Sequence, residues 1–260
     1  MYIKPYDELT IQDNFIFQKV MRNKRICKQT IERLLDIDIK DISYPEEEKS
    51  INVRLDSKSI RLDVYVNDDR GTVFNIEMQT TKDMDELVKR TRYYQGLIDI
   101  DNIEKGQNYS ALHDTYIIFI CTFGVFTGKR HKYTFRNLCI EDNEILLNDG
   151  TTKLFLSTKG EADDVSKPLK IFLDYVDGKK PEDALMQEID HEVDTVKHCD
   201  EWRRDYMTLA LEMDKKWREG KAEGKIEAIR NAIKDGLTTL AAVKKSGRYT
   251  EEEIAAIAAP

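Results

Sequence analysis

Two short segments on either side of a polar turn constrain the fold of this chain more than any other feature. Residues 61–66 and 73–79 alternate apolar and polar side chains, as β-strands do, and the turn 67–71 between them ends in Gly71. This pattern predicts a β-hairpin centred on Arg70. One face of the hairpin is expected to hold the apolar side chains of Leu62, Val64, Val66, Phe74, Ile76 and Met78.

The opposite face of the predicted hairpin brings two carboxylates together. Asp63 and Glu77 are equidistant from Arg70, so this register places them directly opposite each other, with Gln79 on the same face. Opposed side chains in an antiparallel pair have Cβ atoms about 4.5–5.5 Å apart, and two carboxylates there repel unless a proton or a cation lies between them. A hard divalent cation would remove the repulsion, so the pair is a predicted metal site.

An alternative interpretation of the same residues needs no metal. In that interpretation the polar face is simply solvated, and Arg61 pairs diagonally with Glu77. The metal prediction also depends on the register, because a slip of one residue would turn Glu77 to the other face.

Composition sets the size and the environment of the protein. The 260 residues are 40 % apolar, enough for one sizeable core and a small appendage. Residues 1–13 lack the continuous apolar core of a signal peptide, and the longest apolar run, 116–121, is too short to span a bilayer. The scattered cysteines are expected to be reduced thiols of a cytoplasmic protein; they are Cys27, Cys121, Cys139 and Cys199.

The distribution of charge leaves nucleic acid open as a partner. The net charge is −8, but most of the acidic excess lies in residues 181–220, and residues 1–180 are nearly neutral. Two basic clusters, at 19–28 and 129–132, have the composition of phosphate-binding patches. For either cluster taken alone, an ordinary solvated surface is the favoured interpretation.

The order of predicted elements indicates an α/β protein with helices on the faces of a mixed sheet. Helices are predicted at 13–23, around 27–34, and at 83–102, 164–176, 181–196 and 203–220. Strands other than the hairpin are predicted at 51–55, 115–121, 132–140 and 152–157. We divide the chain into a core at 1–180, an acidic helical segment at 181–220, and a charged linker with a small helical hairpin at 221–260.

The last residues contain two short predicted helices. The first covers 237–245, and Thr250 with Glu253 forms a capping box at the start of the second. A helix-turn-helix that reads DNA is disfavoured, because residues 251–253 are all glutamate and would face phosphates. A hairpin that packs on the chain or mediates self-association fits better, which leaves room for a homo-oligomer.

Other common chemistries lack a signature in this sequence. It contains no Walker A loop, no Gly-x-Ser-x-Gly and no His-Glu-x-x-His, and the spacing of His191, His198 and Cys199 matches no familiar zinc site. His113 and His131 lie near the ends of predicted strands, and each is expected to be a surface residue rather than a catalyst.

The hairpin and several flanking motifs resemble a known family. The motifs stand in this order: Asp13–Phe17, Ile60–Val66, Asn75–Gln79, Arg92–Gln95, Gly106–Tyr109, Tyr116–Phe123 and Tyr133–Asn137. Together they resemble the recombination-promoting nuclease and putative transposase family, a branch of the PD-(D/E)XK nuclease superfamily. The resemblance extends from about residue 8 to 220.

The resemblance implies a restriction-endonuclease-like core, cleavage of DNA phosphodiesters with Mg²⁺ (Mn²⁺ as a substitute), and a link to recombination or mobile elements. Asp63 matches the first acidic position, Glu77 the second, and Gln79 the position of the superfamily lysine. The glutamine departs from the superfamily pattern, and so does Gly124, where an aspartate is expected after Phe123. The carbonyl of residue 78 is a further expected metal ligand.

The neutral Gln79 raises the question of where positive charge comes from. Arg61, Lys82 and Arg90 are the nearby cations that would compensate for the lost lysine. The competing interpretation is a nuclease fold that has lost catalysis and only binds DNA or a partner. A third is a structural oligomer built on the acidic helices of 181–220, with an inert hairpin.

Overall fold

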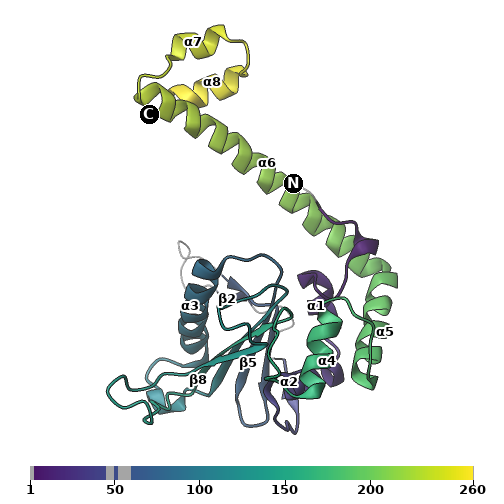
Figure 1. Cartoon of the computed structure of the whole chain (residues 1–260). Helices are drawn as coiled ribbons and strands as arrows, with labels where there is room; N and C mark the ends of the chain where they lie inside the picture. The colour runs from purple at the N-terminus through teal and green to yellow at the C-terminus, as the bar shows by residue number, and fades with distance from the viewer. Residues whose placement is uncertain (1–2, 45–49, 52–59, 260) are drawn as a thin grey trace. The chain divides into compact units, whose positions relative to one another are not determined.

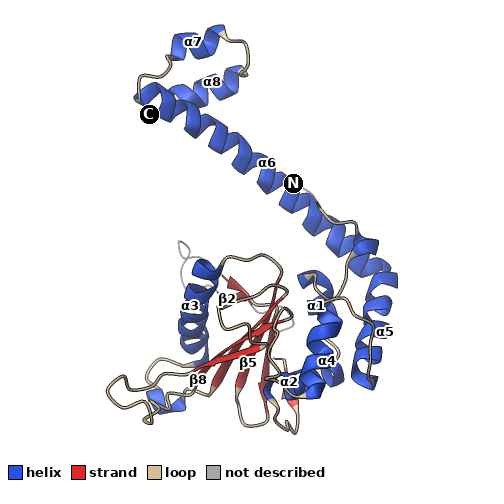
Figure 2. Cartoon of the chain, in the orientation of Figure 1, coloured by secondary structure: helices blue, strands red, loops and turns tan. Residues whose placement is uncertain are grey.

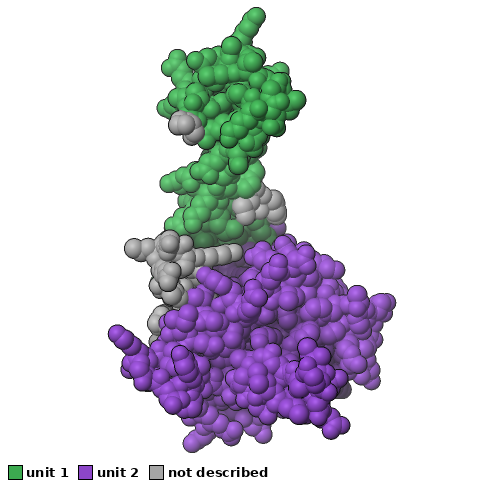
Figure 3. Space-filling model, turned by 90° about the vertical axis from the view of Figure 1, so that its left-hand side faces the viewer, with its two compact units in different colours: residues 1–6, 200–260 green, residues 7–199 purple. Residues whose placement is uncertain are grey.

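The computed structural model describes residues 3–44, 50–51 and 60–259, and the chain forms two compact units. One unit comprises residues 7–199, and the other combines residues 1–6 with 200–260 (Figure 3). The division of the chain into 1–180, 181–220 and 221–260 stays a prediction.

A six-stranded mixed sheet forms the centre of the larger unit. In spatial order its strands are β1 (Ile42–Ser43), β4 (Val64–Asp68), β5 (Val73–Gln79), β6 (Thr115–Cys121), β8 (Thr151–Ser157) and β7 (Lys132–Phe135). β5, β6 and β8 run parallel, whereas β1, β4 and β7 pair antiparallel to their neighbours. β2 (Ser50–Ile51) and β3 (Ile60–Arg61) form a separate two-stranded ladder.

Helices cover both faces of this sheet (Figures 1 and 2). α3 (Met84–Asn102) lies on one face; on the other are α1 (Asn14–Val20), α2 (Lys24–Leu35), α4 (Lys167–Val176) and α5 (Ala184–His198). Short 3-10 turns occur at Tyr6–Glu8 and Tyr109–Ala111. No helix in the described part of the chain is long and apolar enough to cross a membrane. The predicted fold class, a mixed sheet flanked by helices with a helical C-terminal extension, is confirmed.

The predicted register of the β4–β5 hairpin is also confirmed. Tyr65 pairs with Asn75, so the hairpin is centred on Arg70. The turn is held by Asp68, whose Oδ1 accepts hydrogen bonds from two backbone N–H groups in the turn, at 2.8 and 2.9 Å. Gly71 has a φ of 84°, a backbone conformation that residues other than glycine rarely adopt.

Both faces of the hairpin are buried, which the alternation alone did not indicate. On the face under α3, a hydrophobic cluster includes Tyr65 and Val73 from the hairpin and Phe119 from β6. The prediction for Leu62 was wrong: it packs in this same cluster, because it precedes β4 and does not follow the strand's alternation. The carboxylates therefore lie beside a packed core.

Several predicted boundaries shift. The strand predicted at 132–140 stops at Phe135, beyond which a bridge between Leu138 and Leu146 closes a loop. Asp13 does not cap α1 with its side chain, which instead accepts a hydrogen bond from the backbone N–H of Thr10 (2.7 Å). The predicted strand 51–55 lies, apart from residue 51, outside the described residues.

The second unit is helical. It contains α6 (Asp200–Lys234), α7 (Leu240–Lys245) and α8 (Glu251–Ala258), and the predicted charged linker is an uninterrupted part of α6. The capping box of Thr250 and Glu253 is confirmed. Lys225 pairs with Glu253 (2.9 Å), and Arg230 donates from Nε to the carbonyl of Ala256 (3.1 Å), so α8 is fixed to α6.

Candidate active site

Asp63 and Glu77 are joined through the backbone. Asp63 lies directly before β4, and Glu77 lies in β5. The backbone N–H of Asp63 donates to Oε1 of Glu77 (3.1 Å), and the backbone N–H of Met78 donates to Oδ2 of Asp63 (3.1 Å). The two predicted metal ligands therefore lie together, as the register required.

Glu77 is held in a buried and electrostatically strained environment. Its side chain is only 2 % exposed, whereas Asp63 is half-buried. Burial first, and then the charge of Asp63, raise the pKa of Glu77 well above its usual range, and hydrogen bonding and the Arg90 charge oppose this only in part. The amide of Asn75, oriented so that both its ends are satisfied, donates to Oε1 of Glu77 (3.1 Å). The site thus keeps an acidic group where a bound cation would stabilise its charged form.

Two amides of α1 hold the other carboxylate. Gln18 donates from Nε2 to Oδ1 of Asp63 (2.7 Å), and Asn14 donates to the same oxygen at 3.5 Å. Sequence reasoning did not assign these residues to the site. The motif at 13–17 pointed to this helix. No local pattern, however, shows which side chains of α1 contact Asp63, which lies more than forty residues further along the chain.

Arg90 of α3 links the second carboxylate to Gln79. Its guanidinium donates to Oε1 of Gln79 (3.1 Å) and to Oε2 of Glu77 (3.3 Å). Among the cations expected to compensate for the missing lysine, it is the one with a direct contact to both residues in the described structure. Lys82 is exposed and forms no ion pair within the described residues, and the side chain of Arg61 lies outside them.

Aromatic rings hold the Arg90 guanidinium in place. It lies 5.2 Å from the ring centroid of Tyr94 and 5.5 Å from that of Phe119. It also donates to the hydroxyl oxygen of Tyr94 (2.8 Å). Burial, and then the charge of Glu77, raise the pKa of this hydroxyl to about 12, so Tyr94 is neutral at physiological pH. Arg90 is thus fixed by both polar and aromatic contacts.

The two basic clusters are largely neutralised by acidic neighbours. In the first cluster, Arg25 pairs with Glu188 and Lys28 pairs with Glu32. In the second, Lys129 pairs with Glu161 at 2.8 Å. These contacts agree with the favoured interpretation that neither cluster is a dedicated phosphate-binding patch.

The surface position predicted for His131 was wrong, whereas His113 is exposed as expected. His131 is 2 % exposed, and its Nδ1 lies 2.8 Å from the carbonyl of Ala162 and 3.1 Å from Oδ1 of Asp164. Because both partners accept, Nδ1 carries the hydrogen. His131 directly precedes β7, and its ring contacts the segment that follows β8. This histidine therefore joins two loops of the fold.

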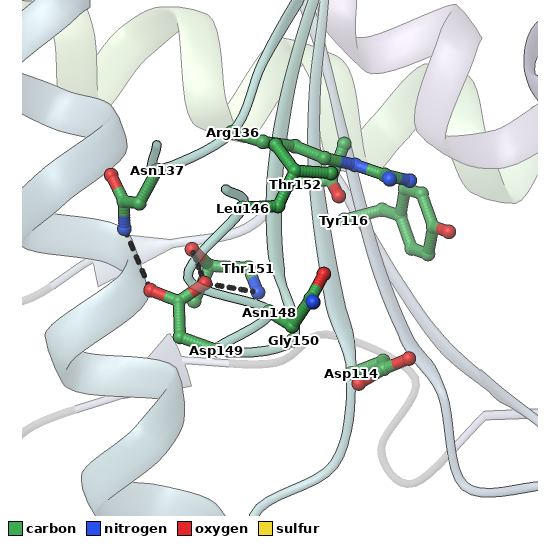
Figure 4. A pocket seen from close by; sticks show the side chains of 10 residues that line it. All are labelled: Asp114, Tyr116, Arg136, Asn137, Leu146, Asn148, Asp149, Gly150, Thr151 and Thr152. Carbon is green, nitrogen blue, oxygen red and sulfur yellow. Dashed lines mark hydrogen bonds between the residues drawn. The ribbon is translucent and has the colours of Figure 1, made fainter. Parts of the chain in front are cut away.

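A small polar pocket lies away from the carboxylates. It has a volume of about 160 Å³ and is lined by residues at the starts of β6 and β8 and in the segment between β7 and β8 (Figure 4). Glu77 and Gln79 lie instead near the end of the parallel strand β5. Its polar groups bind one another: Asp149 accepts from Asn137 (2.6 Å) and from the hydroxyl of Thr151 (3.0 Å). None of the predicted site residues lines this pocket.

The fold and the carboxylate pair together define an α/β protein of the PD-(D/E)XK nuclease type. A family model described as PD-(D/E)XK nuclease family transposase matches residues 14–158, more than half of the chain. The protein belongs to this family, and a nuclease or transposase-like role follows from that membership. Neither a curated protein nor a solved structure matches the chain.

Proposed function

We propose that the protein is a Mg²⁺-dependent DNA endonuclease that hydrolyses phosphodiester bonds in recombination or in the movement of mobile elements. The observation that supports this best is that Asp63, directly before β4, lies opposite Glu77 of β5, inside the region matched by the family. A cytoplasmic location is part of the proposal, because all four cysteines are free thiols.

The donor set fits a hard divalent cation. Asp63 and Glu77 offer carboxylate oxygens, the ligands that Mg²⁺ prefers. Burial, and then the charge of Asp63, raise the pKa of Glu77, and a bound cation would offset both effects. The described residues contain no cluster of three or more acidic, histidine or cysteine ligands, so further ligands would be water and the carbonyl of Met78. When bound, Mg²⁺ supplies a polarised water and neutralises charge on the phosphate.

The surrounding residues keep these ligands in place. Gln18 and the backbone N–H of Met78 fix the two oxygens of Asp63, while the backbone N–H of Asp63 and Arg90 fix those of Glu77. Gln79 is suited to donate a hydrogen bond to the reacting group, since an amide is a poor base. This preorganisation lowers the cost of aligning the reacting atoms.

A nuclease fold that only binds DNA or a partner is the second candidate. It is favoured by one observation, the neutral Gln79 in place of a lysine. A pure binding module, however, gains nothing from keeping a buried glutamate opposite an aspartate, because such a pair costs stability when no cation is bound.

Nicking of supercoiled plasmid DNA separates the two. Wild type and Asp63→Ala are incubated with Mg²⁺, Mn²⁺ or EDTA. The proposal expects metal-dependent nicking by the wild type that Asp63→Ala lacks. Equal nicking by both proteins would assign the activity to another site or to a contaminant. No cleavage by either, together with salt-sensitive DNA binding, would favour the binding module.

A further inference from the structure

The contact between Gln79 and Arg90 suggests how this site works without the superfamily lysine. A lysine at that position combines two properties in one ammonium group: positive charge and a hydrogen-bond donor. Gln79 has a donor but no charge. Arg90 has a charge that is permanent at any physiological pH, and its guanidinium lies against Oε1 of Gln79 (3.1 Å).

The orientation of the Gln79 amide follows from this contact. A guanidinium contains only donors, so the amide must turn its oxygen toward Arg90. Its NH₂ group is then the other end, and that group has no hydrogen-bond partner within the described residues. Gln79 as a whole is half-buried rather than fully enclosed.

Arg90 is restrained in a way that suits a fixed charge. It donates to Oε2 of Glu77 and to the hydroxyl oxygen of Tyr94, and its plane lies near two aromatic rings. A donor–acceptor chain in a partly buried site polarises its members, so the bond from Arg90 makes the Gln79 NH₂ a stronger donor.

We propose that Gln79 and Arg90 act as one composite unit in the place of the lysine. Gln79 donates from Nε2 to an oxygen of the reacting phosphate or water, and Arg90 supplies the positive charge through Gln79 Oε1. Arg90 is thus a positioning residue that acts through Gln79. This inference rests on the proposed nuclease activity.

The composite unit predicts an unusual pattern among substitutions. In Gln79→Lys, an ammonium would face the guanidinium of Arg90, so the single substitution places two cations together. In Arg90→Gln, the charge is lost. The double variant Gln79→Lys/Arg90→Gln removes the conflict and restores one cation. The double variant is therefore expected to be more active than either single variant.

The experiment measures kcat and KM for nicking of supercoiled plasmid with Mg²⁺ by the full chain. Arg90→Gln is expected to lower kcat about 100-fold, the usual effect of losing one preorganised donor or charge at a reacting group. KM and the DNA affinity measured with Ca²⁺ are expected to change little. The kcat of the double variant is expected to be about tenfold or more above that of Arg90→Gln. Lys89→Gln, which removes an exposed cation from the same helix, is the matched control and is expected to leave kcat unchanged.

Thermal unfolding of each variant shows that it is folded, and Arg90→Lys provides a second variant that keeps the charge. Lower activity for Arg90→Gln than for Arg90→Lys supports the proposal. Wild-type kcat in Arg90→Gln, or no recovery in the double variant, overturns the composite unit while the nuclease activity stands. If the wild type itself cleaves no DNA with any divalent cation, the proposed function and this inference fall together.

Discussion

Asp63 and Glu77 fix one another's position through main-chain hydrogen bonds. The N–H of Asp63 donates to Glu77, and the N–H that follows Glu77 donates back to Asp63, both at 3.1 Å. Because both donors are backbone N–H groups, one directly before β4 and one in β5, the two carboxylates are oriented by the main chain of the hairpin. Their mutual repulsion is then built into the fold, and a cation that relieves it should stabilise the folded protein.

The first prediction is that divalent cations raise the melting temperature of the wild-type protein. A ligand that binds only the folded state adds about 2.7 kcal/mol at a concentration about 100 times its Kd. Differential scanning fluorimetry with Mg²⁺, Mn²⁺ and EDTA tests this without any DNA. The stabilisation by Mg²⁺ should disappear in Asp63→Asn, because the amide keeps the shape of the side chain but loses the charge.

Asp69→Asn is the control for that measurement. Asp69 is an exposed carboxylate in the turn of the same hairpin, and its substitution removes one negative charge without touching the site. It should retain the full response to Mg²⁺. An equal loss of response in both variants would indicate nonspecific binding of the cation to the acidic surface.

The second prediction concerns Gln18, which sequence reasoning missed. Its amide donates to Oδ1 of Asp63 (2.7 Å) and so orients a proposed metal ligand. Removal of such a supporting group typically lowers metal affinity or activity about 10- to 100-fold. Gln18→Ala should therefore weaken Mg²⁺ binding in a thermal-shift titration and slow nicking by a factor in that range.

Gln12→Ala separates this effect from a general loss of stability. Gln12 donates to the carbonyl of Val176, so it anchors the same N-terminal region to α4. Its substitution should lower the melting temperature but leave the Mg²⁺ titration as in the wild type. If Gln18→Ala behaves in the same way, Gln18 has only a structural role.

The sequence predicted the hairpin well because the features that determine a hairpin are local in the chain. Alternation and a glycine-containing turn determine the register, and the register places Asp63 opposite Glu77. Gln18 and Arg90 reach the pair from separate helices, and their contacts depend on how those helices rotate against the sheet. Periodicity shows which face of a helix is buried. It does not show which residue of the sheet is contacted by a polar side chain at the edge of that face.

The error at His131 has a similar origin. Histidine between basic residues is typical of a surface loop, yet its ring is buried between two loops that are far apart in the sequence. The acceptors that make burial tolerable, the carbonyl of Ala162 and the carboxylate of Asp164, follow β8. Only the tertiary fold brings them to His131, so no pattern around residue 131 indicates them.

The third prediction is that Lys82 contacts a DNA phosphate. It lies in the exposed segment between Gln79 and α3 and forms no ion pair within the described residues. Lys82→Ala should weaken binding to all DNA sequences about equally and reduce the slope of log K against log salt by about 1. Fluorescence anisotropy with Ca²⁺ at several salt concentrations provides the measurement.

Lys129→Ala is the matched control for this prediction. Lys129 is also exposed, but it already pairs with Glu161 (2.8 Å), so it has less charge to offer a phosphate. Its substitution should leave the salt slope close to that of the wild type. The opposite result, a reduced slope for Lys129→Ala and none for Lys82→Ala, would move the DNA-binding surface to the loop before β7.

The fourth prediction is an acid-dependent loss of stability at Asp164. Burial raises the pKa of this carboxyl, but hydrogen bonds from the backbone and ring of His131 outweigh that effect and hold the pKa below its usual range. Arg130 also faces this carboxylate, with its Nη1 at 3.7 Å from Oδ2. A lowered folded-state pKa means that the ionised carboxylate stabilises the fold above its unfolded pKa, which is about 3.9. That contribution is lost as the pH falls through the folded-state value.

Melting temperatures of the wild type and Asp164→Asn between pH 7 and pH 3 test this sign. At pH 7 the variant should be about 1–2 kcal/mol less stable, because it loses charge-assisted hydrogen bonds to His131. The difference should begin to shrink below about pH 5, where the unfolded wild type starts to bind the proton, and should continue to shrink below about pH 3.9. Asp163→Asn, an exposed neighbour, should show no such pH-dependent difference. A gap that stays constant across this range would mean that Asp164 stabilises the loops by shape rather than by its charge.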